Sequence, residues 1–354
     1  MPAETEPHER TWMAWPSTGY TLGDTAAQAE EARSAWAAVA AAVARFEPVS
    51  IVVAPEAVEV ARDRLGEQVE LHVAPLDDAW MRDMGPTFVV DESGRLGAVD
   101  WVFNGWGAQH WATWEQDARV ARSVADWAGA EVVGSSMVNE GGGIHVDGRG
   151  TVLLTETVQR DPHRNPGWTR EDVQAELART IGTSHAIWLP RGLSRDYDTF
   201  GTRGHVDIVA TFPAPGTVLV HAQRDPAHPD HVVSRETAEL LQGSTDAEGR
   251  PLDVVELPAP AGLVDGHGPV DHSYVNHLVV NGGVVACTFD DPHDHAALDI
   301  LASAYPGREV IGVDARALFE RGGGIHCVTA QQPAAAKGPR GEQHAIVSAR
   351  TTIV

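Results

Sequence analysis

The sequence predicts an α/β fold of five similar units arranged around a central site. Short hairpins recur at intervals of about 50 to 70 residues, each followed by a helix and another strand. A polar residue leads each unit: Asp83, His145, His205, Asn276 and Cys327. Because no such unit buries a sheet face alone, a radial arrangement would supply a shared core. The alternative is an ordinary mixed sheet, which would scatter these polar residues.

Four segments carry the apolar spacing and start signals of helices. Asp24 or Thr25 is a suitable N-cap for the first. Thr169 is expected to cap the second, with Glu171 and Asp172 in its first turn. The predicted helices span residues 26–46, 169–181, 234–241 and 295–305.

Short apolar segments between turn residues are predicted strands. A last strand is expected to open at Cys327. The other predicted strands span residues 49–53, 69–73, 87–90, 151–155, 207–212, 217–221, 277–280, 284–289 and 310–313.

The composition is that of an acidic chain of 354 residues with a net charge of -24. This charge disfavours nucleic acid and anionic membranes as partners. It is compatible with a small cationic substrate, although acidity that serves only solubility explains it equally well. No stretch approaches the roughly 20 apolar residues of a membrane helix, and a signal-peptide core is missing. We therefore expect a cytoplasmic enzyme whose two cysteines are thiols.

The most informative segment is Gly-Gly-Gly-Ile-His-Cys at residues 322–327. A glycine run permits a tight backbone approach, and it delivers Cys327 at the end of an expected turn, as a nucleophile would require. Taken alone, Cys327 is more often a small buried hydrophobic residue. The polar residues upstream favour the nucleophile. Cys287, within an apolar strand, is expected to be buried and inert.

Three carboxylates and a histidine lead the other units. Asp83 stands in Trp-Met-Arg-Asp-Met-Gly-Pro, and Glu140 precedes two glycines. His205 and Asp207 form a His-x-Asp pair, which on a strand places both side chains on one face. With Cys327 they would make a site of three carboxylates, one imidazole and one thiol. A metal site is the less favoured alternative, because the pairs that could ligate one lack zinc-finger spacing. Those pairs are His145 with Asp147, His205 with Asp207, and His326 with Cys327.

This set suits chemistry on a planar cation. Two aspartates, Asp83 and Asp207, can pair with the N–H donors of a guanidinium group. Cys327 thiolate would attack the central carbon and expel ammonia, with His205 as acid and then base and Glu140 holding the imidazole. Nearby carboxylates raise the pKa of a thiol, so the bound cation or charged His205 must favour the thiolate. Each residue also has a structural interpretation, as an ion-pair partner, a turn end or a core pair, and only their joint placement favours a site.

These residues together resemble the agmatine deiminase family, a Porphyromonas-type peptidyl-arginine deiminase group in the guanidino-group-modifying (pentein) superfamily. The resemblance runs nearly end to end. It rests on residues 6–16, 80–89, 140–151, 164–166, 273–276, 290–292 and 322–333.

The resemblance implies one catalytic domain over residues 1–354 with the pentein fold, a five-bladed α/β propeller of ββαβ-like units around a central site. It implies a covalent thiouronium intermediate on Cys327, with His205 as acid and base and Glu140 as its partner. Neither a cofactor nor a metal is expected, and homodimers are common in similar proteins. The residues implied to bind the substrate are Asp83, Asp207 and Trp80.

The approach to His205 departs from the family pattern. The family has Asp-Glu-Thr or Asp-Asp-Thr before Gly-His, and its acid helps to hold the far amine of agmatine. Here several residues are inserted, and Asp196 or Asp198 is expected to take that role. If Arg203 faces the pocket, it would instead favour a carboxylate-bearing guanidine such as arginine, a guanidino acid or peptidyl-arginine. Otherwise Arg203 is a surface charge. Gly324, where the family often has asparagine, is a further position expected beside the substrate, and His277 replaces a usual aromatic residue.

The leading prediction is therefore a guanidine hydrolase that converts agmatine and water to N-carbamoylputrescine and ammonia in polyamine synthesis. An amidinotransferase would use the same residues but pass the amidino group to an amine. A non-enzymatic member is the third hypothesis, because this fold also occurs in a ribosome-binding translation factor. Retention of all five site residues and the acidic charge oppose it. Whether the loop at residues 196–203 closes over the site is a question for the structure.

Overall fold

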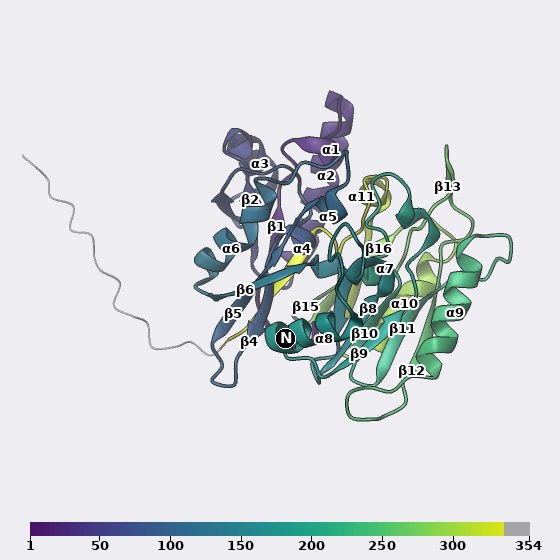
Figure 1. The fold of residues 1–354 in the computed structure, drawn as a ribbon. Coiled ribbons are helices and arrows are strands. Elements are labelled where there is room, and N and C mark those ends of the chain that lie inside the picture. Colours follow the sequence, from purple (N-terminus) through teal and green to yellow (C-terminus); the bar gives the residue numbers. More distant parts are fainter. Residues whose placement is uncertain (336–354) are drawn as a thin grey trace, which may run out of the picture.

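The computed structural model describes residues 1–335, which form an α/β fold of small sheets and covering helices (Figure 1). Five sheets have three or four strands each, and a two-stranded ribbon is separate from them. In four of the five, an antiparallel hairpin is followed by a helix and then by a parallel strand, and in the fifth the antiparallel pair joins two distant segments of the chain. The predicted repeat of hairpin, helix and strand is therefore confirmed.

Four units follow one another along the chain. The first comprises β4 (Thr87–Val90), β5 (Leu96–Val102), α6 (Val120–Ala128) and β6 (Glu131–Val138). The second comprises β7 (Ile144–Val146), β8 (Thr151–Thr155), α8 (Arg170–Ile181) and β9 (His185–Leu189). The third comprises β10 (Ala210–Ala214), β11 (Thr217–Ala222), α9 (Asp230–Gln242) and β12 (Asp253–Pro258). The fourth comprises β15 (Leu278–Val280), β16 (Gly283–Thr288), α10 (Asp294–Ala304) and β17 (Glu309–Asp314).

The two ends of the described chain build the fifth unit together. β18 (Thr329–Pro333) pairs antiparallel with β1 (His8–Ala14), which pairs parallel with β2 (Val49–Val53) after α2 (Ala26–Val43), and β3 (Glu70–Val73) is the outer strand. This pairing anchors the segment that carries the site cysteine to the start of the chain. The remaining elements are α1 (Gly19–Leu22), α3 (Val58–Leu65), α4 (Met81–Met84), α5 (Gly105–Ala108), α7 (Glu156–Gln159), α11 (Arg316–Phe319) and the ribbon of β13 (Val264–Asp265) and β14 (Gly268–Pro269).

All four predicted helices are present. Thr25 caps α2 and Thr169 caps α8, each in a capping box with the residue three positions on. α2 ends before the predicted residue 46, because the chain must turn before Pro48, which disfavours helical backbone at the residue before it. α9 begins earlier than predicted, directly after Pro229, whose fixed φ suits a helix start.

Most predicted strands differ from the observed ones by at most one residue at an end. The strand prediction at residues 207–212 is wrong in its first half, because Val206–Ile208 form a 3-10 turn and β10 begins only at Ala210. The last strand likewise begins at Thr329, after a turn that contains Cys327. Strands with mixed polarity were missed, as in β6, which is largely exposed along its first six residues. β5 was expected only as the second strand of the first hairpin, without bounds, and the missed strands are β1, β6, β7, β9, β12, β13 and β14.

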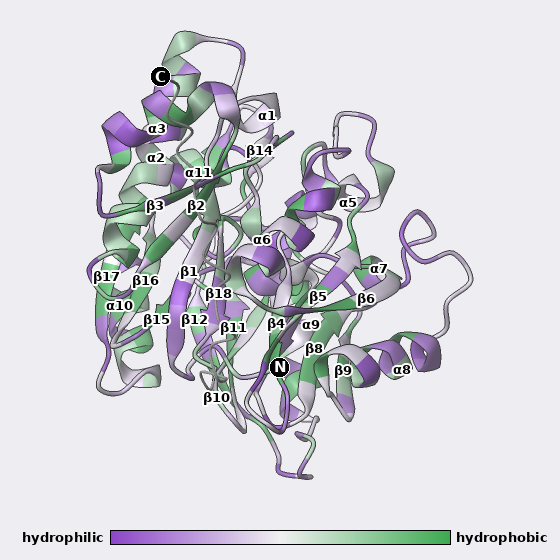
Figure 2. Cartoon of the chain, turned by 90° about the vertical axis from the view of Figure 1, so that its left-hand side faces the viewer, coloured by the Kyte–Doolittle hydropathy of each residue, from purple (hydrophilic) through white to green (hydrophobic). Residues whose placement is uncertain are grey.

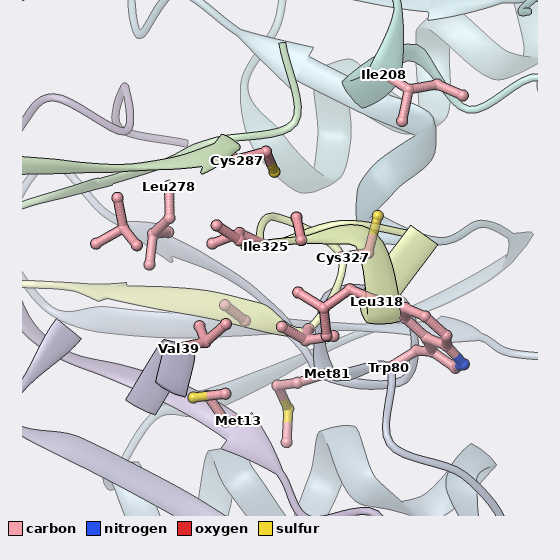
Figure 3. Close-up of a cluster of buried hydrophobic side chains, with 14 of the residues drawn as sticks. Met13, Val39, Trp80, Met81, Ile208, Leu278, Cys287, Leu318, Ile325 and Cys327 are labelled. Carbon is pink, nitrogen blue, oxygen red and sulfur yellow. The ribbon is translucent and has the colours of Figure 1, made fainter. Parts of the chain in front are cut away.

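Apolar side chains fill the space between the sheets and the helices. Figure 2 shows hydrophobic residues along inner strands such as β8, whereas α8 presents a largely hydrophilic surface. Figure 3 shows part of this core, in which Cys287, fully buried as expected, lies near Ile325, and Cys327 lies at the edge beside Trp80. Among residues 1–335 no helix is both long and apolar enough to cross a membrane.

Candidate active site

Five polar side chains from four units converge at one place, and each lies shortly before the first strand of its unit. The thiol of Cys327 donates to Asp207 Oδ2 at 3.6 Å. His205 Nδ1 lies 3.8 Å from Asp83 Oδ1, and its Nε2 lies 3.3 Å from Glu140 Oε2. All five residues are at most 5% exposed. The structure thus brings together the complete set that the sequence predicted.

The convergence does not have the predicted cause. His205 lies directly before a 3-10 turn and Asp207 lies within it, so the alternation of side chains along a strand does not align them. Gly142 shows the alignment directly: a Cβ there would lie 2.5 Å from His205 Nδ1, 3.0 Å from Asp207 Oδ2 and 3.1 Å from Asp83 Oδ1. Three polar atoms therefore surround one point, which only glycine leaves open.

Two buried polar atoms of these side chains have no hydrogen-bond partner within the described chain. They are Asp207 Oδ1 and His205 Nδ1. Buried polar groups in proteins are nearly always paired, and an unpaired one costs free energy. The pair therefore marks the place where a ligand with N–H donors would satisfy a carboxylate.

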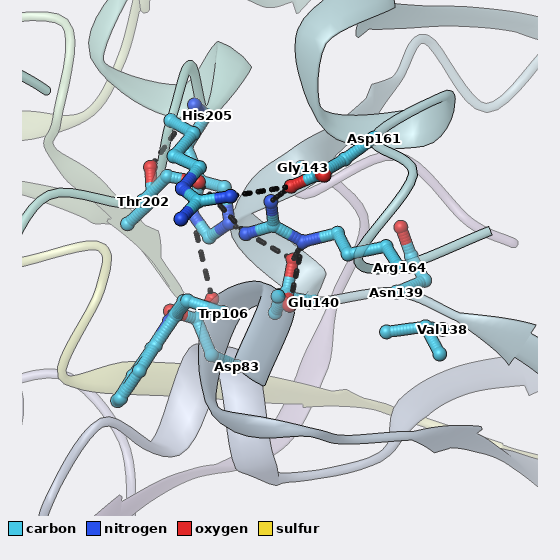
Figure 4. A network of polar contacts seen from close by, with 12 residues as sticks. Asp83, Trp106, Val138, Asn139, Glu140, Gly143, Asp161, Arg164, Thr202 and His205 are labelled. Atoms are coloured by element: carbon cyan, nitrogen blue, oxygen red, sulfur yellow. Dashed lines mark hydrogen bonds and ion pairs between the residues drawn. The ribbon is translucent and has the colours of Figure 1, made fainter. Parts of the chain in front are cut away.

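Asp83, from α4, is oriented by two donors. Trp106 Nε1 donates to Asp83 Oδ2 at 2.8 Å, and the amide of Gly142 donates to Oδ1 at 3.1 Å (Figure 4). Burial raises the pKa of Asp83 to about 6, although the charge of His205 opposes the shift. Near neutral pH this carboxyl is mostly ionised and available to a cation.

Glu140 is held by an arginine that the sequence analysis did not assign. Arg164 Nε donates to both Glu140 oxygens at 3.0 Å, Nη1 donates to Asp161 Oδ2 at 2.9 Å and Nη2 to the Thr202 carbonyl at 2.7 Å (Figure 4). Burial acts against the charged form, but Arg164 and then His205 lower the pKa of Glu140 to about 2. No local pattern marks Arg164, because its partner stands far upstream in the chain.

His205 is the cationic member of the site. Burial alone would lower its pKa, but the carboxylates of Asp83, Glu140 and Asp207 together raise the pKa of His205 to about 9. A predicted amine ligand, Asp196, instead fixes the loop before this histidine. Its carboxylate accepts from Thr202 N and Gly204 N at 2.6 Å and from His205 N at 3.1 Å. These hydrogen bonds use both carboxylate oxygens of Asp196 within the loop.

Cys327 follows the glycine run and lies against Trp80. A Cβ on Gly323 would lie 2.8 Å from the Trp80 ring and 2.9 Å from Cys327 Sγ. Asn276 Nδ2 donates to the sulfur at 3.2 Å, a role that the sequence analysis missed although it noted Asn276 at a unit start. Gly324 is packed against Asn276, since its Cβ would meet Asn276 Oδ1 at 2.4 Å. Burial, Asp207 and Asp83 raise the pKa of the Cys327 thiol well above its usual range.

Arg203 is directed to an acid within the protein. Its Nη1 lies 3.4 Å from Asp161 Oδ2, beside the Arg164 pair, and its side chain is 34% exposed. Asp198 is also exposed and lies 3.6 Å from Arg195. Asp198 lines a cavity of about 890 Å³ to which Arg203 does not contribute. The other acids of this cavity are Asp196, Asp265, Asp271 and Glu320, and its aromatic residues are Tyr20, Tyr197, Phe200 and Phe319.

The pairs that were weighed as metal ligands, the less favoured alternative, do not meet as pairs within residues 1–335, and of their members only His145 and His326 share a group. Asp147 Oδ1 accepts from the amides of Arg149 and Thr151 in its own turn. The shared group, Glu4 with His145 and His326, has its ligand atoms within 4.8 Å of one another.

Comparisons with known proteins agree with this geometry. The family model of the Porphyromonas-type peptidyl-arginine deiminases matches residues 1–333. A Streptomyces coelicolor protein, provisionally named an agmatine deiminase, is 60% identical over 334 residues, covering 94% of this chain and 98% of that protein. The agmatine deiminase of Stutzerimonas stutzeri is 40% identical over 357 residues, covering 94% and 95%.

The fold is likewise shared with solved structures. An agmatine deiminase of Enterococcus faecalis aligns with a TM-score of 0.88 and 31% identity, over 94% of this chain and 95% of that one. The α/β class and the resemblance inferred from the sequence are confirmed. With its family model matched from residue 1 to residue 333, the chain belongs to the Porphyromonas-type peptidyl-arginine deiminase family.

Proposed function

We propose that the protein is an agmatine deiminase, which hydrolyses agmatine to N-carbamoylputrescine and ammonia in polyamine synthesis. The observation that carries the proposal is the buried group of Cys327, His205, Asp83 and Asp207, with Asp207 Oδ1 left without a donor from residues 1–335. Relatives that share this chain from end to end, including the Stutzerimonas stutzeri agmatine deiminase, support it.

Asp83 and Asp207 bind the guanidinium group in this proposal. Two carboxylates that face one another suit the planar fork of N–H donors, and each charged pair is stronger than a neutral hydrogen bond. Trp106 and the Gly142 amide fix Asp83 before substrate arrives. Trp80, beside Cys327, provides an apolar surface for the methylene chain.

The bound cation also activates the nucleophile. In the empty site, burial and the two aspartates keep Cys327 as a thiol, because its pKa is raised. A guanidinium that neutralises Asp83 and Asp207 removes this repulsion and favours loss of the thiol proton to solvent. The thiolate then forms only beside the carbon that it attacks, which protects the free enzyme from unwanted alkylation or oxidation.

His205 moves the protons of both half-reactions. Cys327 Sγ forms a bond to the central carbon, the C–N bond breaks, and His205 gives its proton to the departing nitrogen, which leaves as ammonia. The covalent product is a thiouronium. Neutral His205 then takes one proton from water as the water oxygen bonds to the carbon, the C–S bond breaks to restore the thiolate, and the second water proton leaves to solvent to give the neutral ureido product. Glu140, held by Arg164, stabilises the charged imidazole.

The charges near the site favour agmatine over a carboxylate-bearing guanidine. Arg203 is paired with Asp161, so its charge is not available to a substrate carboxylate. The cavity beside the loop is lined by five acidic residues and two arginines, Arg195 and Arg316, and this excess of acids suits the distal ammonium of agmatine. The same residues would also suit an amidinotransferase, which is the second candidate. No observation favours it over hydrolysis.

We also propose the finer architecture and setting expected from the family. The five hairpin units surround the site as blades of a propeller in one domain spanning residues 1–354, of which 336–354 lie outside the described residues. The enzyme is cytoplasmic, a homodimer is its candidate assembly because homodimers are common in similar proteins, and its partner molecules are small cationic guanidines, not nucleic acid or membranes. The supporting observations are the five sheets, the convergence of their leading turns and the free thiols.

The test is ureido-product formation by purified protein with agmatine, arginine, 4-guanidinobutyrate and a peptidyl-arginine. Turnover of agmatine alone, with one ammonia released per ureido product and no added amine, is expected. Preference for a carboxylate-bearing substrate would overturn the agmatine assignment and leave the cysteine chemistry standing. Dependence on an added amine would indicate an amidinotransferase, and no turnover of any guanidine would indicate a non-enzymatic protein.

A further inference from the structure

A buried histidine next to the nucleophile joins two carboxylates. His326 Nδ1 lies 2.8 Å from Asp207 Oδ2, and His326 Nε2 lies 2.8 Å from Glu4 Oε1. All three residues are at most 5% exposed. The backbone of His326 is fixed as well, since its amide donates to Asn276 Oδ1 at 3.0 Å and its carbonyl accepts from Arg82 Nε at 3.2 Å. The ring therefore has little freedom to move.

A neutral imidazole has one N–H and cannot donate to carboxylates at both nitrogens. Two short contacts to carboxylates therefore require the imidazolium form. We propose that Glu4 and His326 are positioning residues for the guanidinium-binding Asp207: Glu4 holds His326 as an imidazolium, which orients the Asp207 carboxylate and keeps it ionised. This inference rests on the proposed function, because it assigns Asp207 to the substrate.

The charged groups around the His326 ring come from several elements, and their charges balance. Arg82, from α4, places Nη1 3.3 Å from Glu4 Oε1. His145, on β7, has its Nε2 3.9 Å from Glu4 Oε2 and shares a 2.7 Å hydrogen bond with Thr211. His277, before β15, shares a 2.8 Å hydrogen bond with the Tyr305 hydroxyl. Two cationic side chains, Arg82 and His326, thus lie next to two anionic side chains, Glu4 and Asp207.

The pKa directions agree with this geometry. Burial and Arg82 act against the charged ring, but Glu4 and Asp207 outweigh them and raise the pKa of His326. Burial likewise opposes ionisation of Asp207, but the bond to His326 lowers its pKa. This arrangement determines which oxygen of Asp207 the substrate can contact. His326 and the Cys327 thiol both contact Asp207 Oδ2, so the other oxygen, Oδ1, is left for the substrate.

A metal ion is the competing occupant, because Glu4, His145 and His326 have ligand atoms close together. A metal would need an unprotonated nitrogen of His326 facing Glu4, which excludes the imidazolium. The donors already present argue against it. Gln331 Nε2 and Arg82 Nη1 both lie 3.3 Å from Glu4 Oε1, where a divalent ion would have to bind. The two occupants therefore make opposite predictions for chelation.

The experiment compares Glu4→Gln, Glu4→Asp and the matched control Glu6→Gln, which removes the same charge from an exposed position of the same segment. Two readouts are taken across pH: kcat/KM for agmatine, and the rate at which iodoacetamide labels Cys327 without substrate, followed by peptide mass spectrometry. Glu4→Gln is expected to lower kcat/KM at neutral pH by about tenfold, equivalent to one pKa unit, mainly through KM. In Glu4→Gln, the acidic limb of the kcat/KM profile and the pH profile of Cys327 labelling should both move to higher pH. The reason is that Asp207 and the Cys327 thiol lose the cationic form of His326 beside them.

Glu4→Asp keeps the charge and should return the profiles towards wild type, and Glu6→Gln should match wild type. Equal loss of activity at all pH values in Glu4→Gln, with unshifted profiles, would overturn the proposal. So would a stoichiometric metal found by mass spectrometry whose removal by EDTA abolishes labelling and turnover. If Glu4→Gln fails to fold, His326→Gln gives the same two profiles. If neither the wild type nor any variant hydrolyses agmatine, but the pH profile of Cys327 labelling still shifts in Glu4→Gln, only the proposed function fails.

Discussion

The thiol of Cys327 donates a 3.6 Å hydrogen bond to the carboxylate of Asp207, the residue that also faces the guanidinium position. A nucleophile placed beside an anion is poorly ionised until that anion is neutralised. Substrate binding and nucleophile activation are therefore linked through one side chain. A cationic guanidine completes the site, whereas a neutral urea product does not, and this asymmetry also favours product release.

Replacing the nucleophile should separate binding from chemistry. Cys327→Ala is expected to abolish ureido-product formation, a loss of at least about 10⁴-fold, because no other group within reach can form the covalent intermediate. Agmatine should still bind, since both aspartates remain, and calorimetry measures this. Cys287→Ala, which removes the other buried thiol, should keep turnover. Activity in Cys327→Ala, or its loss in both variants alike, would contradict the assigned role.

The pH dependence follows from three site groups. The Asp83 carboxyl, whose pKa is raised to about 6, must be ionised to bind guanidinium, so kcat/KM should rise through pH 6. The Cys327 thiol, whose pKa is raised well above its usual range, must lose its proton, so kcat/KM should keep rising above pH 6. The His205 imidazole, with a pKa of about 9, must be protonated to release ammonia, so this rise should stop as pH passes 9 in steady-state rates. A profile that keeps rising above pH 9 would remove His205 as the acid.

A methyl group at Gly142 should fill the site without harming the fold. Gly142 has no positive φ, but its Cβ would lie 2.5 Å from His205 Nδ1 and close to both aspartates. Displacement of these groups by a fraction of an ångström is expected to lower kcat about a hundredfold. Gly134→Ala is the matched control, because a Cβ at Gly134 meets nothing within 4 Å. Thermal melting should show both variants folded. Full activity in Gly142→Ala would mean that reaction does not occur at this point.

The repeat and the site residues were predictable because each is marked by local sequence. Cys327 follows a glycine run, Glu140 precedes one, and turn residues mark each hairpin. The reason for the convergence was not predictable. His205 and Asp207 are aligned by a 3-10 turn whose entry Asp196 fixes through four backbone and side-chain bonds, and no short pattern marks such a turn.

Residues that act through distant partners were missed for the same reason. Glu4 reaches His326 across nearly the whole chain, and Arg164 reaches Glu140 from another segment. Such pairs carry no spacing signal, because tertiary packing alone brings them together. Pairing of β1 with β18 explains the first case, since it joins the two ends of the described chain.

Arg164 should matter for stability as well as catalysis. Arg164→Gln would leave Glu140 fully buried without its main cationic partner and with only His205 beside it, and the free energy of unfolding is expected to fall by about 3 kcal/mol. The double variant Glu140→Gln with Arg164→Gln should recover part of this loss, because no charge is then stranded. Arg160→Gln, which breaks an exposed pair with Glu156, should cost less than about 1 kcal/mol. Denaturant unfolding measures all three, and equal losses for Arg160 and Arg164 would contradict the argument.

Substrate choice should be insensitive to Arg203. Its guanidinium is paired with Asp161, so Arg203→Gln is expected to change kcat/KM for agmatine by less than about fivefold, the range of an exposed ion pair. 4-Guanidinobutyrate should not be turned over by the wild type or by Arg203→Gln. Asp198→Asn, in the acidic cavity, should instead raise KM for agmatine alone, because it removes a carboxylate from the side expected to hold the ammonium. If Arg203→Gln selectively abolished turnover of 4-guanidinobutyrate, the arginine would have to leave Asp161 and bind the substrate carboxylate, and the agmatine assignment would lose its electrostatic basis.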